Sequence, residues 1–335
     1  MIGRRAGVVQ QARPILIRRV DADPNPMVRI GEDARTGLTA APRTLSPKYF
    51  YDARGSELFE QITRLPEYYQ TRTERAILER IAHDIVDDIR PRALVEFGSG
   101  SASKTRVLLD AMRDAGLLRG YGAIEVSESA LVASAHDLLE RYPNLRFEGL
   151  LEDFQRHVVL PFAGDARLIL FLGSTIGNLT PAEAVRFLGG VRESMGPDDG
   201  FLIGFDLVKE PALLLAAYDD EEGVTACFNL NVLSVLNREL DGDIDPGDFR
   251  HRAVYNADRS RIEMHLVAIR PVRARLTQID FDLEMDAGET IRTELSHKFT
   301  RSSAQRLISR AGLRLSRWDC DARKRFALGL ARRIR

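Results

Sequence analysis

The middle of the chain alternates between short apolar runs and amphipathic stretches. Apolar runs of strand length lie at residues 92–97, 121–126, 146–151, 168–172 and 200–205. The stretches between them place apolar side chains at helical spacing. Strands that alternate with helices predict a parallel sheet with helices on both faces. The expected fold class is therefore α/β, with a doubly wound, Rossmann-like domain.

This alternation stops after residue 207. Residues 211–240 have helical spacing, and residues 249–299 contain period-two stretches that predict strands. A helix near 302–311, followed by two apolar runs, predicts that the first sheet then resumes. The helical region 28–89 also lies outside the alternating pattern. We expect this region and the late block to pack together as a second, split α+β lobe, leaving a cleft.

The first predicted strand ends in a glycine-rich turn that leads into a helix, with the sequence ALVEFGSGSASKT at residues 93–105. Gly98 and Gly100 have no side chain, so a ligand can approach the backbone closely. The helix that follows would direct its N-terminus at that ligand. The turn therefore predicts a nucleotide-like cofactor.

Three kinds of cofactor use such turns. A dinucleotide fingerprint needs a third glycine where this chain has Ser103. A phosphate loop fits residues 98–105 except for Ser103 before Lys104, and the apolar run at 168–172 does not end in a magnesium-binding Asp. The first motif of S-adenosylmethionine enzymes, in which an acid precedes G-x-G by one residue, is matched at 94–100. We favour S-adenosylmethionine and keep a phosphate-loop, ATP-dependent enzyme as the alternative.

Composition argues against several functional classes. The chain has 48 Lys plus Arg and 49 Asp plus Glu, so no overall field would attract nucleic acid. Cys227 and Cys320 lack metal-ligand spacing and do not indicate a disulfide framework. No run approaches the roughly 18 apolar residues needed to span a membrane. We expect a cytoplasmic monomer that binds no metal, nucleic acid or membrane.

Polar residues follow the second and third predicted strands. Glu125 lies where a doubly wound sheet places a ribose-binding carboxylate, although an ordinary solvated glutamate would look the same. Asp153 and Phe154 are placed to contact an adenine amino group and ring, or else to serve as a helix cap and a core aromatic. Lys104 would meet a ligand carboxylate or lie on the surface.

The loop GSTIGNLT at residues 173–180 follows the fourth predicted strand. It lies at the carboxyl edge of the sheet, where open α/β folds bind ligands. Asn178 offers both a donor and an acceptor there. Thr180 begins the next helix as an N-cap, with Glu183 at the third helical position.

Three segments resemble one family closely: SPKYFYDARGSELF at 46–59, LPEYYQTRTE at 65–74 and FLGSTIGNLT at 171–180. They are similar to the S-adenosylmethionine-dependent L-histidine Nα-methyltransferases of ergothioneine biosynthesis, from about residue 38 to the C-terminus. The resemblance implies a class I methyltransferase that trimethylates the α-amino group of L-histidine to hercynine without a metal. Gln70 and Leu230 depart from the family pattern without removing an expected hydrogen bond.

The resemblance also implies the domain organisation and the cofactor site. Residues 1–26 would be a disordered tail or an upstream sequence. The expected substrate-binding lobe comprises residues 27–75 and 208–298, and the expected methyltransferase domain comprises residues 76–207 and 299–335. Five residues would bind S-adenosylmethionine, namely Gly98, Lys104, Glu125, Asp153 and Phe154.

Seven residues would line the histidine site by the same resemblance, namely Tyr51, Tyr68, Asn178, Tyr218, Met264, Glu294 and Ser296. Asn178 and Tyr218 would hold the histidine carboxylate. Tyr51, the candidate catalytic residue, would lie near the amino group. The other four would surround the imidazole ring.

The segment TELSHKF at 293–299 carries the sharpest expectation. Alternation places Glu294, Ser296 and Lys298 on one strand face, either against a ligand or at a solvent-facing edge. An apolar residue at position 294 would instead have suggested another amine, such as tryptophan. A methyltransferase for another amino acid or small amine, and a cofactor-binding regulatory module without activity, stay as alternatives.

Overall fold

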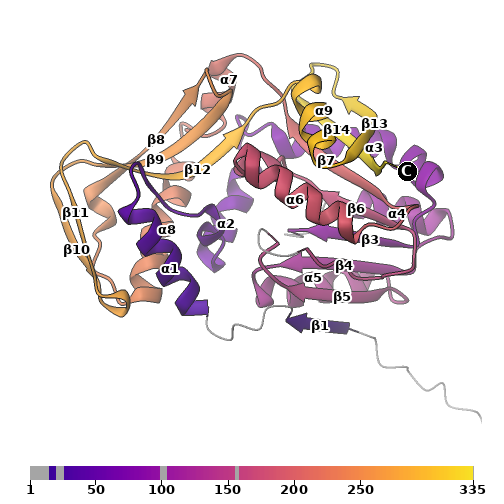
Figure 1. Cartoon of the computed structure of the whole chain (residues 1–335), viewed down its shortest axis with the longest axis horizontal. Helices are drawn as coiled ribbons and strands as arrows, with labels where there is room; N and C mark the ends of the chain where they lie inside the picture. Colours follow the sequence, from indigo (N-terminus) through magenta and orange to yellow (C-terminus); the bar gives the residue numbers. More distant parts are fainter. Residues whose placement is uncertain (1–14, 20–25, 99–103, 155–157, 335) are drawn as a thin grey trace, which may run out of the picture.

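The computed structural model describes residues 15–19, 26–98, 104–154 and 158–334 (Figure 1). Its largest sheet has eight strands in the order β1-β5-β4-β3-β6-β7-β14-β13. All neighbours from β1 to β7 are parallel, whereas β14 and β13 add antiparallel strands. The strands are β1 (Ile15–Arg19), β3 (Ala93–Phe97), β4 (Gly120–Glu125), β5 (Arg146–Leu151), β6 (Arg167–Phe171), β7 (Gly200–Asp206), β13 (Leu313–Cys320) and β14 (Phe326–Arg333).

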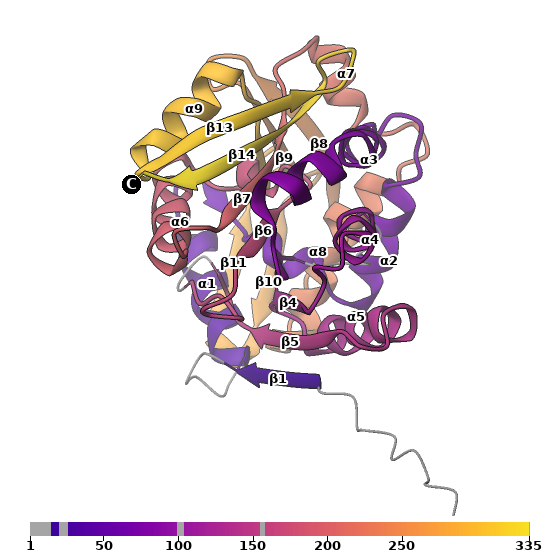
Figure 2. The same cartoon turned by 90° about the vertical axis from the view of Figure 1, so that its right-hand side faces the viewer.

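Helices cover both faces of this sheet. Buried apolar residues of α3 (Gln70–Ile89), α4 (Arg106–Asp114) and α5 (Glu128–Arg141) pack on one face. Those of α6 (Pro181–Ser194) and α9 (Arg301–Arg310) pack on the other. Figure 2 shows the sheet between the two sets of helices. The prediction of a doubly wound α/β fold is confirmed.

The start of α6 follows the predicted capping chemistry. The Thr180 hydroxyl accepts from the Glu183 N–H, and the Glu183 carboxylate accepts from the Thr180 N–H at 2.8 Å. These contacts satisfy two donors that a helix N-terminus otherwise leaves unpaired. The loop at 173–180 is therefore held rigidly at its far end.

A second group of elements lies beside the large sheet (Figure 1). It contains a four-stranded sheet in the order β2-β12-β9-β8, a two-stranded hairpin, and several helices. The strands are β2 (Arg43–Thr44), β8 (Phe249–Asn256), β9 (Arg261–Ala268), β10 (Val272–Leu276), β11 (Phe281–Met285) and β12 (Thr290–His297). The helices are α1 (Pro26–Thr39), α2 (Ala53–Ile62), α7 (Pro211–Ala216) and α8 (Val224–Leu240), with 3-10 turns η1 (Pro47–Phe50), η3 (Pro246–Asp248) and η4 (Thr277–Ile279). The 3-10 turn η2 (Thr175–Asn178) belongs instead to the loop between β6 and α6.

The N-terminal region and the late block share one hydrophobic core. Buried apolar side chains from residues 30–65 pack with others from residues 228–291. Strand β2 also pairs with β12 in parallel register. Segments far apart in the sequence thus bury their apolar faces against each other, because neither forms a closed core by itself.

Two predicted boundaries need correction. Residues 15–19 form edge strand β1 rather than part of a disordered tail, because they pair with β5 and because Ile17 packs on the main core. The other residues of the predicted tail up to 25 lie outside the described residues. The predicted division between residues 75 and 76 falls inside α3, which packs on the large sheet as one unit. We therefore propose that the substrate lobe ends before Gln70.

Two of the points at which the chain crosses between the two groups lie next to each other. Leu207, after β7, forms an isolated parallel bridge with Phe299, after β12. The Phe299 N–H donates to the Asp206 carbonyl oxygen at 2.8 Å, and the Val208 N–H donates to the Phe299 carbonyl oxygen at 2.9 Å. These bonds bring the C-terminal ends of β7 and β12 side by side.

Candidate functional site

The glycine turn begins as the sequence predicts. Gly98 has φ +72°, in the left-handed region that other residues rarely adopt. A Cβ atom at this position would meet no atom of the described residues within 4 Å. The Gly98 N–H donates to the Ile124 carbonyl oxygen at 3.0 Å. The backbone at Gly98 is thus accessible to a ligand, while Gly100 lies outside the described residues.

The acidic residue of this motif holds the turn together. Both Glu96 carboxylate oxygens accept from the Thr105 hydroxyl at 2.7 Å, and one accepts from the Tyr121 hydroxyl at 2.8 Å. Burial raises the pKa of Glu96 to about 7, although these hydrogen bonds act in the opposite direction. Glu96 therefore ties β3, β4 and the start of α4 into one frame.

Lys104 pairs with a residue that the sequence did not single out. Its ammonium forms an ion pair with Glu74, which is completely buried on α3. The same carboxylate accepts from the Gly173 N–H at 2.8 and 3.0 Å. Glu74 lies on the apolar face of its helix, near Ile77, and a charge at such a position was the available signal. The role of Lys104 toward a ligand carboxylate stays a prediction.

Glu125 and Asp153 lie at the expected strand ends. Glu125 is the last residue of β4 and is half-buried. Asp153 follows β5, is buried, and accepts from the Lys48 ammonium at 3.0 Å. Lys48 belongs to η1, so this ion pair joins the two groups of elements at the edge of the large sheet.

Phe154 lies among core aromatic residues. Its ring centroid is 5.6 Å from that of Phe97, 5.6 Å from that of Phe171 and 5.4 Å from that of Phe187. These distances are typical of packed aromatic pairs. The structure thus places Phe154 as a core aromatic, and its contact with an adenine ring stays a prediction.

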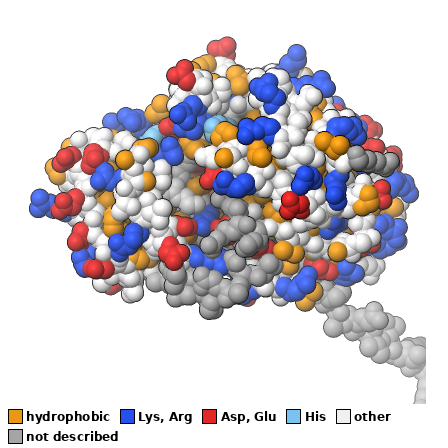
Figure 3. All heavy atoms as spheres, in the orientation of Figure 1, with side chains coloured by type: hydrophobic (Ala, Val, Ile, Leu, Met, Phe, Trp, Pro, Cys, Tyr) orange, Lys and Arg blue, Asp and Glu red, His pale blue; other side chains and the backbone are white. Residues whose placement is uncertain are grey.

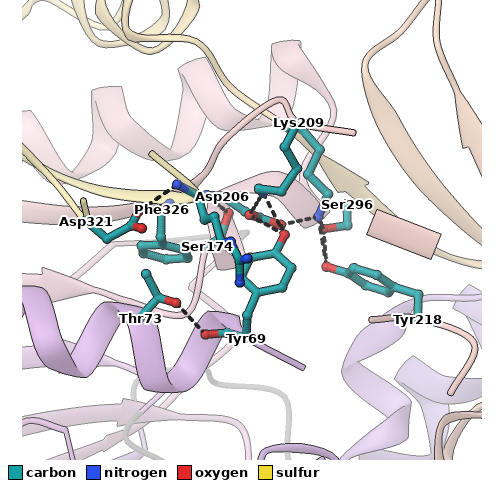
Figure 4. A network of polar contacts seen from close by, with 11 residues as sticks. Tyr69, Thr73, Ser174, Asp206, Lys209, Tyr218, Ser296, Asp321 and Phe326 are labelled. Atoms are coloured by element: carbon teal, nitrogen blue, oxygen red, sulfur yellow. Dashed lines mark hydrogen bonds and ion pairs between the residues drawn. The ribbon is translucent and has the colours of Figure 1, made fainter. Parts of the chain in front are cut away.

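On the other side, Tyr218 and Ser296 come together as the resemblance implies. Their hydroxyl oxygens are 2.7 Å apart, and the Lys298 ammonium donates to both, at 2.9 Å to Tyr218 and 2.7 Å to Ser296 (Figure 4). The Lys298 ammonium also lies 4.5 Å from the Tyr218 ring centroid. The contact between Ser296 and Lys298 confirms that they share one face of the segment.

Glu294 lies two residues before Ser296 and opposite Met264 on β9. Burial raises the pKa of Glu294 to about 7, while the positive charge of Lys298 acts in the opposite direction. Met264 is buried and belongs to the core of the second group. The carboxyl group therefore stands beside an apolar wall, where its charge is poorly solvated.

Tyr51 and Tyr68 approach the same space from the N-terminal region. Burial raises the pKa of both phenols, and the negative charge of Glu294 raises each of them further. Tyr51 is also affected by Glu125, at the cofactor edge. The Phe59 ring contacts both tyrosines edge-on, with centroid distances of 5.6 and 6.1 Å. Two tyrosines thus lie close enough to Glu294 for its charge to affect them.

Asn178 approaches from the large sheet. It ends η2 and is half-buried. Its neighbour Gly177 lies directly against β12, since a Cβ atom there would come within 2.8 Å of the His297 carbonyl oxygen. The fold therefore brings the loop at 173–180 against the strand that carries Glu294 and Ser296.

A family model described as "Histidine-specific methyltransferase, SAM-dependent" matches residues 30–333. The chain belongs to this family. A histidine N-alpha-methyltransferase of Mycolicibacterium smegmatis is 47% identical over 300 residues, which are 89% of this chain and 93% of that protein. The ergothioneine biosynthesis protein 1 of Neurospora crassa is 33% identical over 83% of this chain and 32% of its own length. A 4-dimethylallyltryptophan N-methyltransferase of Claviceps purpurea is 27% identical over 83% of this chain and 87% of its own.

This histidine-specific methyltransferase family member also contains a buried ionic network that sequence patterns did not indicate. Asp206, at the end of β7, is completely buried and pairs with Lys298 at 2.8 Å and with Lys209. The Tyr69 hydroxyl donates to both Asp206 oxygens at 2.8 and 3.0 Å (Figure 4). Burial disfavours the carboxylate, but the two lysines lower the pKa of Asp206 below its ordinary value.

The surface of the family member adds little to this picture. On the face in Figure 3, Lys and Arg side chains are interspersed with Asp and Glu. Within the described parts of the chain, no helix is both long and apolar enough to cross a bilayer.

Proposed function

We propose that this enzyme transfers methyl groups from S-adenosylmethionine to the α-amino nitrogen of L-histidine, in three rounds, to form hercynine, the first step of ergothioneine biosynthesis. The observation that carries this proposal is the group on β12. A half-buried Glu294 with a raised pKa stands beside the hydroxyls of Ser296 and Tyr218, and two tyrosines face it. Such a face suits a small ligand with a polar ring.

The imidazole ring would bind at Glu294 and Ser296. A ring N–H donates to the Glu294 carboxylate, and the Ser296 hydroxyl would lie beside the ring. Because the pKa of Glu294 is about 7, the carboxylate form dominates above that pH. Met264 would line the apolar edge of the ring. The histidine carboxylate would accept hydrogen bonds from Asn178 and Tyr218.

The amino group must reach the methyl donor as a neutral amine. A free α-amine has a pKa of roughly 8, and desolvation in an enclosed site favours its uncharged form. Tyr51 has a raised pKa and stays a neutral phenol, so we propose that it orients the amine through its hydroxyl rather than acting as a strong base. The aromatic faces of Tyr51 and Tyr68 would tolerate the quaternary ammonium product.

S-adenosylmethionine supplies an electrophilic methyl group when it is bound. We propose that Gly98, Lys104, Glu125, Asp153 and Phe154 hold it. The open backbone at Gly98 and the position of Glu125 at the end of β4 support this assignment. Alignment of the two reactants by such contacts can lower the barrier by several kcal/mol. We also propose a monomeric enzyme, because one chain provides every residue of the site.

Mass spectrometry of histidine incubated with the enzyme and S-adenosylmethionine tests the proposal. We expect products with one, two and three added methyl groups, and the trimethylated product should accumulate. Tryptophan and histamine serve as matched amines, and neither should be methylated at a comparable rate. Methylation of tryptophan in preference to histidine would contradict the assignment.

A thermal shift assay separates the cofactor alternatives. S-adenosylhomocysteine should raise the melting temperature, because a ligand that binds the native state stabilises it. Mg-ATP should not. The opposite result would favour the phosphate-loop alternative.

A further inference from the structure

Lys298 is a buried cation with three partners and no role in the function proposed above. Its ammonium lies 2.8 Å from an Asp206 oxygen and donates to the Tyr218 and Ser296 hydroxyls. Its side chain has no solvent exposure. Burying an ammonium costs several kcal/mol unless it is paired and hydrogen-bonded. All three of its donors are used here, so its position is narrowly defined.

These contacts determine the direction of the neighbouring hydrogen bonds. An ammonium can only donate, so Tyr218 and Ser296 must both accept from Lys298. Each hydroxyl keeps one proton, and the contact between them at 2.7 Å uses one of these two protons. The other proton is left to donate elsewhere. The pair therefore presents a donor to a ligand, which suits a carboxylate or an unprotonated ring nitrogen.

Asp206 anchors this arrangement to the large sheet. Its carboxylate is held by Lys209 and by the Tyr69 hydroxyl, and its backbone N–H donates to the Ser174 hydroxyl at 2.9 Å. Ser174 belongs to the loop that leads to Asn178. Lys298 is therefore fixed by the sheet that would bind the cofactor, while it contacts hydroxyls that would bind the substrate.

We propose that Lys298 is a positioning residue of the histidine site: it orients the hydroxyls of Tyr218 and Ser296, and its positive charge acts on Glu294, which lies two residues before Ser296 on the same strand face. The inference rests on the proposed function, because it assigns these three groups to the substrate. It adds a residue that does not contact the substrate but determines the direction of the hydrogen bonds made by the hydroxyls that do.

The groups around Glu294 support the second part of this proposal. The ionisable groups that interact with it are the phenols of Tyr51, Tyr68 and Tyr218 and the ammonium of Lys298. The pKa of each phenol is raised, mainly by burial, so all three are neutral near pH 7. Lys298 is then the charged member of the set, and it opposes the burial that raises the pKa of Glu294.

The pH dependence of kcat/KM for histidine tests the inference. In Lys298→Met, we expect the acidic limb of the kcat/KM profile, where Glu294 gains a proton, to move to higher pH by at least about half a unit. The reason is the loss of a nearby positive charge that favours the carboxylate. At pH 8 we expect kcat/KM to fall at least about tenfold, mainly through KM, since two hydroxyls lose their fixed orientation. The free substrates titrate in the same way with every variant. A difference in the position of the acidic limb between two variants therefore comes from the enzyme.

Two matched variants serve as controls. Lys298→Arg keeps the charge, and its acidic limb should stay at the wild-type position even if the plateau falls. Lys209→Met removes the other lysine that pairs with Asp206. Because Lys209 does not contact Tyr218 or Ser296, the acidic limb of this variant should also stay at the wild-type position. The proposal would be overturned if the acidic limb of Lys298→Met stayed at the wild-type position. It would also be overturned if the acidic limb of Lys209→Met shifted by the same amount.

A second measurement does not depend on activity or on the stability of one variant. The carboxyl ¹³C resonance of Glu294, assigned by its loss in Glu294→Gln, gives the titration of this group without substrate. The midpoint should be higher in Lys298→Met, and also in Lys298→Gln, which removes the charge but keeps a hydrogen-bond donor. An unchanged midpoint in both would refute the electrostatic role, whereas failure of the proposed function would appear as wild-type enzyme that does not methylate histidine.

Discussion

Two carboxyl groups near β12, one fully buried and one half-buried, have pKa values shifted in opposite directions. Asp206 is completely buried, yet its pKa is lowered because Lys298 and Lys209 pair with it. Glu294 has its pKa raised to about 7, because burial outweighs the single opposing charge of Lys298. The difference shows that burial alone does not decide protonation, since the number of close cations does. One carboxylate is paired within the protein, and we propose that the other binds the substrate.

The same contrast separates the two regions that contain these groups. The first region is the junction between the two groups of elements, formed by Tyr69, Asp206 and Lys298. The polar groups of these three residues all bond to other protein groups. At the face of β12 that carries Glu294, burial raises the pKa of this carboxyl group to about 7. The junction therefore needs no ligand to satisfy its polar groups, while the face of Glu294 retains a desolvation cost that, under the proposed function, a bound imidazole would relieve.

Breaking the junction should have the largest effect on stability. We expect Asp206→Ala to lower the free energy of unfolding by about 3–5 kcal/mol, because it leaves buried Lys298 without its main counter-charge. Urea denaturation followed by circular dichroism measures this loss. In the double variant Asp206→Ala/Lys298→Met, much of the stability should return. A loss below about 1 kcal/mol in the single variant would mean that water reaches the junction.

Removing Glu294 should have the next largest effect, on activity. We expect Glu294→Ala to weaken transition-state binding of histidine by about 2–4 kcal/mol, as for a partly buried charged partner. Steady-state kcat/KM for histidine measures the effect. Binding of S-adenosylhomocysteine by calorimetry is the control and should change little. An unchanged kcat/KM would remove Glu294 from the site.

Neutralising Glu294 should instead stabilise the free enzyme, in a pH-dependent way. The pKa of Glu294 is about 7 in the folded state and 4.5 ordinarily, so the folded state binds the proton more tightly. The stability that this proton provides is complete below pH 4.5 and is lost as pH rises through 7. Glu294→Gln should thus gain at most about 3 kcal/mol at pH 8 and little at pH 4. Denaturation curves at both pH values test this, and an equal gain at both would contradict it.

The smallest effect is expected at the Lys48–Asp153 ion pair. The Lys48 side chain is 20% exposed and that of Asp153 is 9% exposed, so water partly screens the pair. We expect Lys48→Met to cost about 1 kcal/mol or less in unfolding free energy. Calorimetry of S-adenosylhomocysteine binding should show a change of less than about tenfold. A larger loss of affinity would mean that Lys48 holds Asp153 in place for the cofactor.

Periodicity and local chemistry determined much of this structure in advance. The alternation of apolar runs between residues 92 and 205 predicted the parallel strands, because buried parallel strands need near-continuous apolar sequence. The capping box at Thr180 and Glu183 and the turn at Gly98 are also local properties, and both were predicted. The edge strand Ile15–Arg19 was missed, because a run of five residues beside a basic segment is too short to show a clear hydrophobic period.

Only the tertiary structure decided how the polar groups pair. Glu74 meets Lys104 across 30 residues, and Asp206 meets Lys298 where two chain crossings run side by side. Sequence spacing records which residues are polar, but burial and charge pairing depend on contacts between segments far apart in the chain. The amino-acid sequence thus determined the fold class and the positions of candidate side chains. The packing of two lobes decided which carboxylates are paired and which one is left for a ligand.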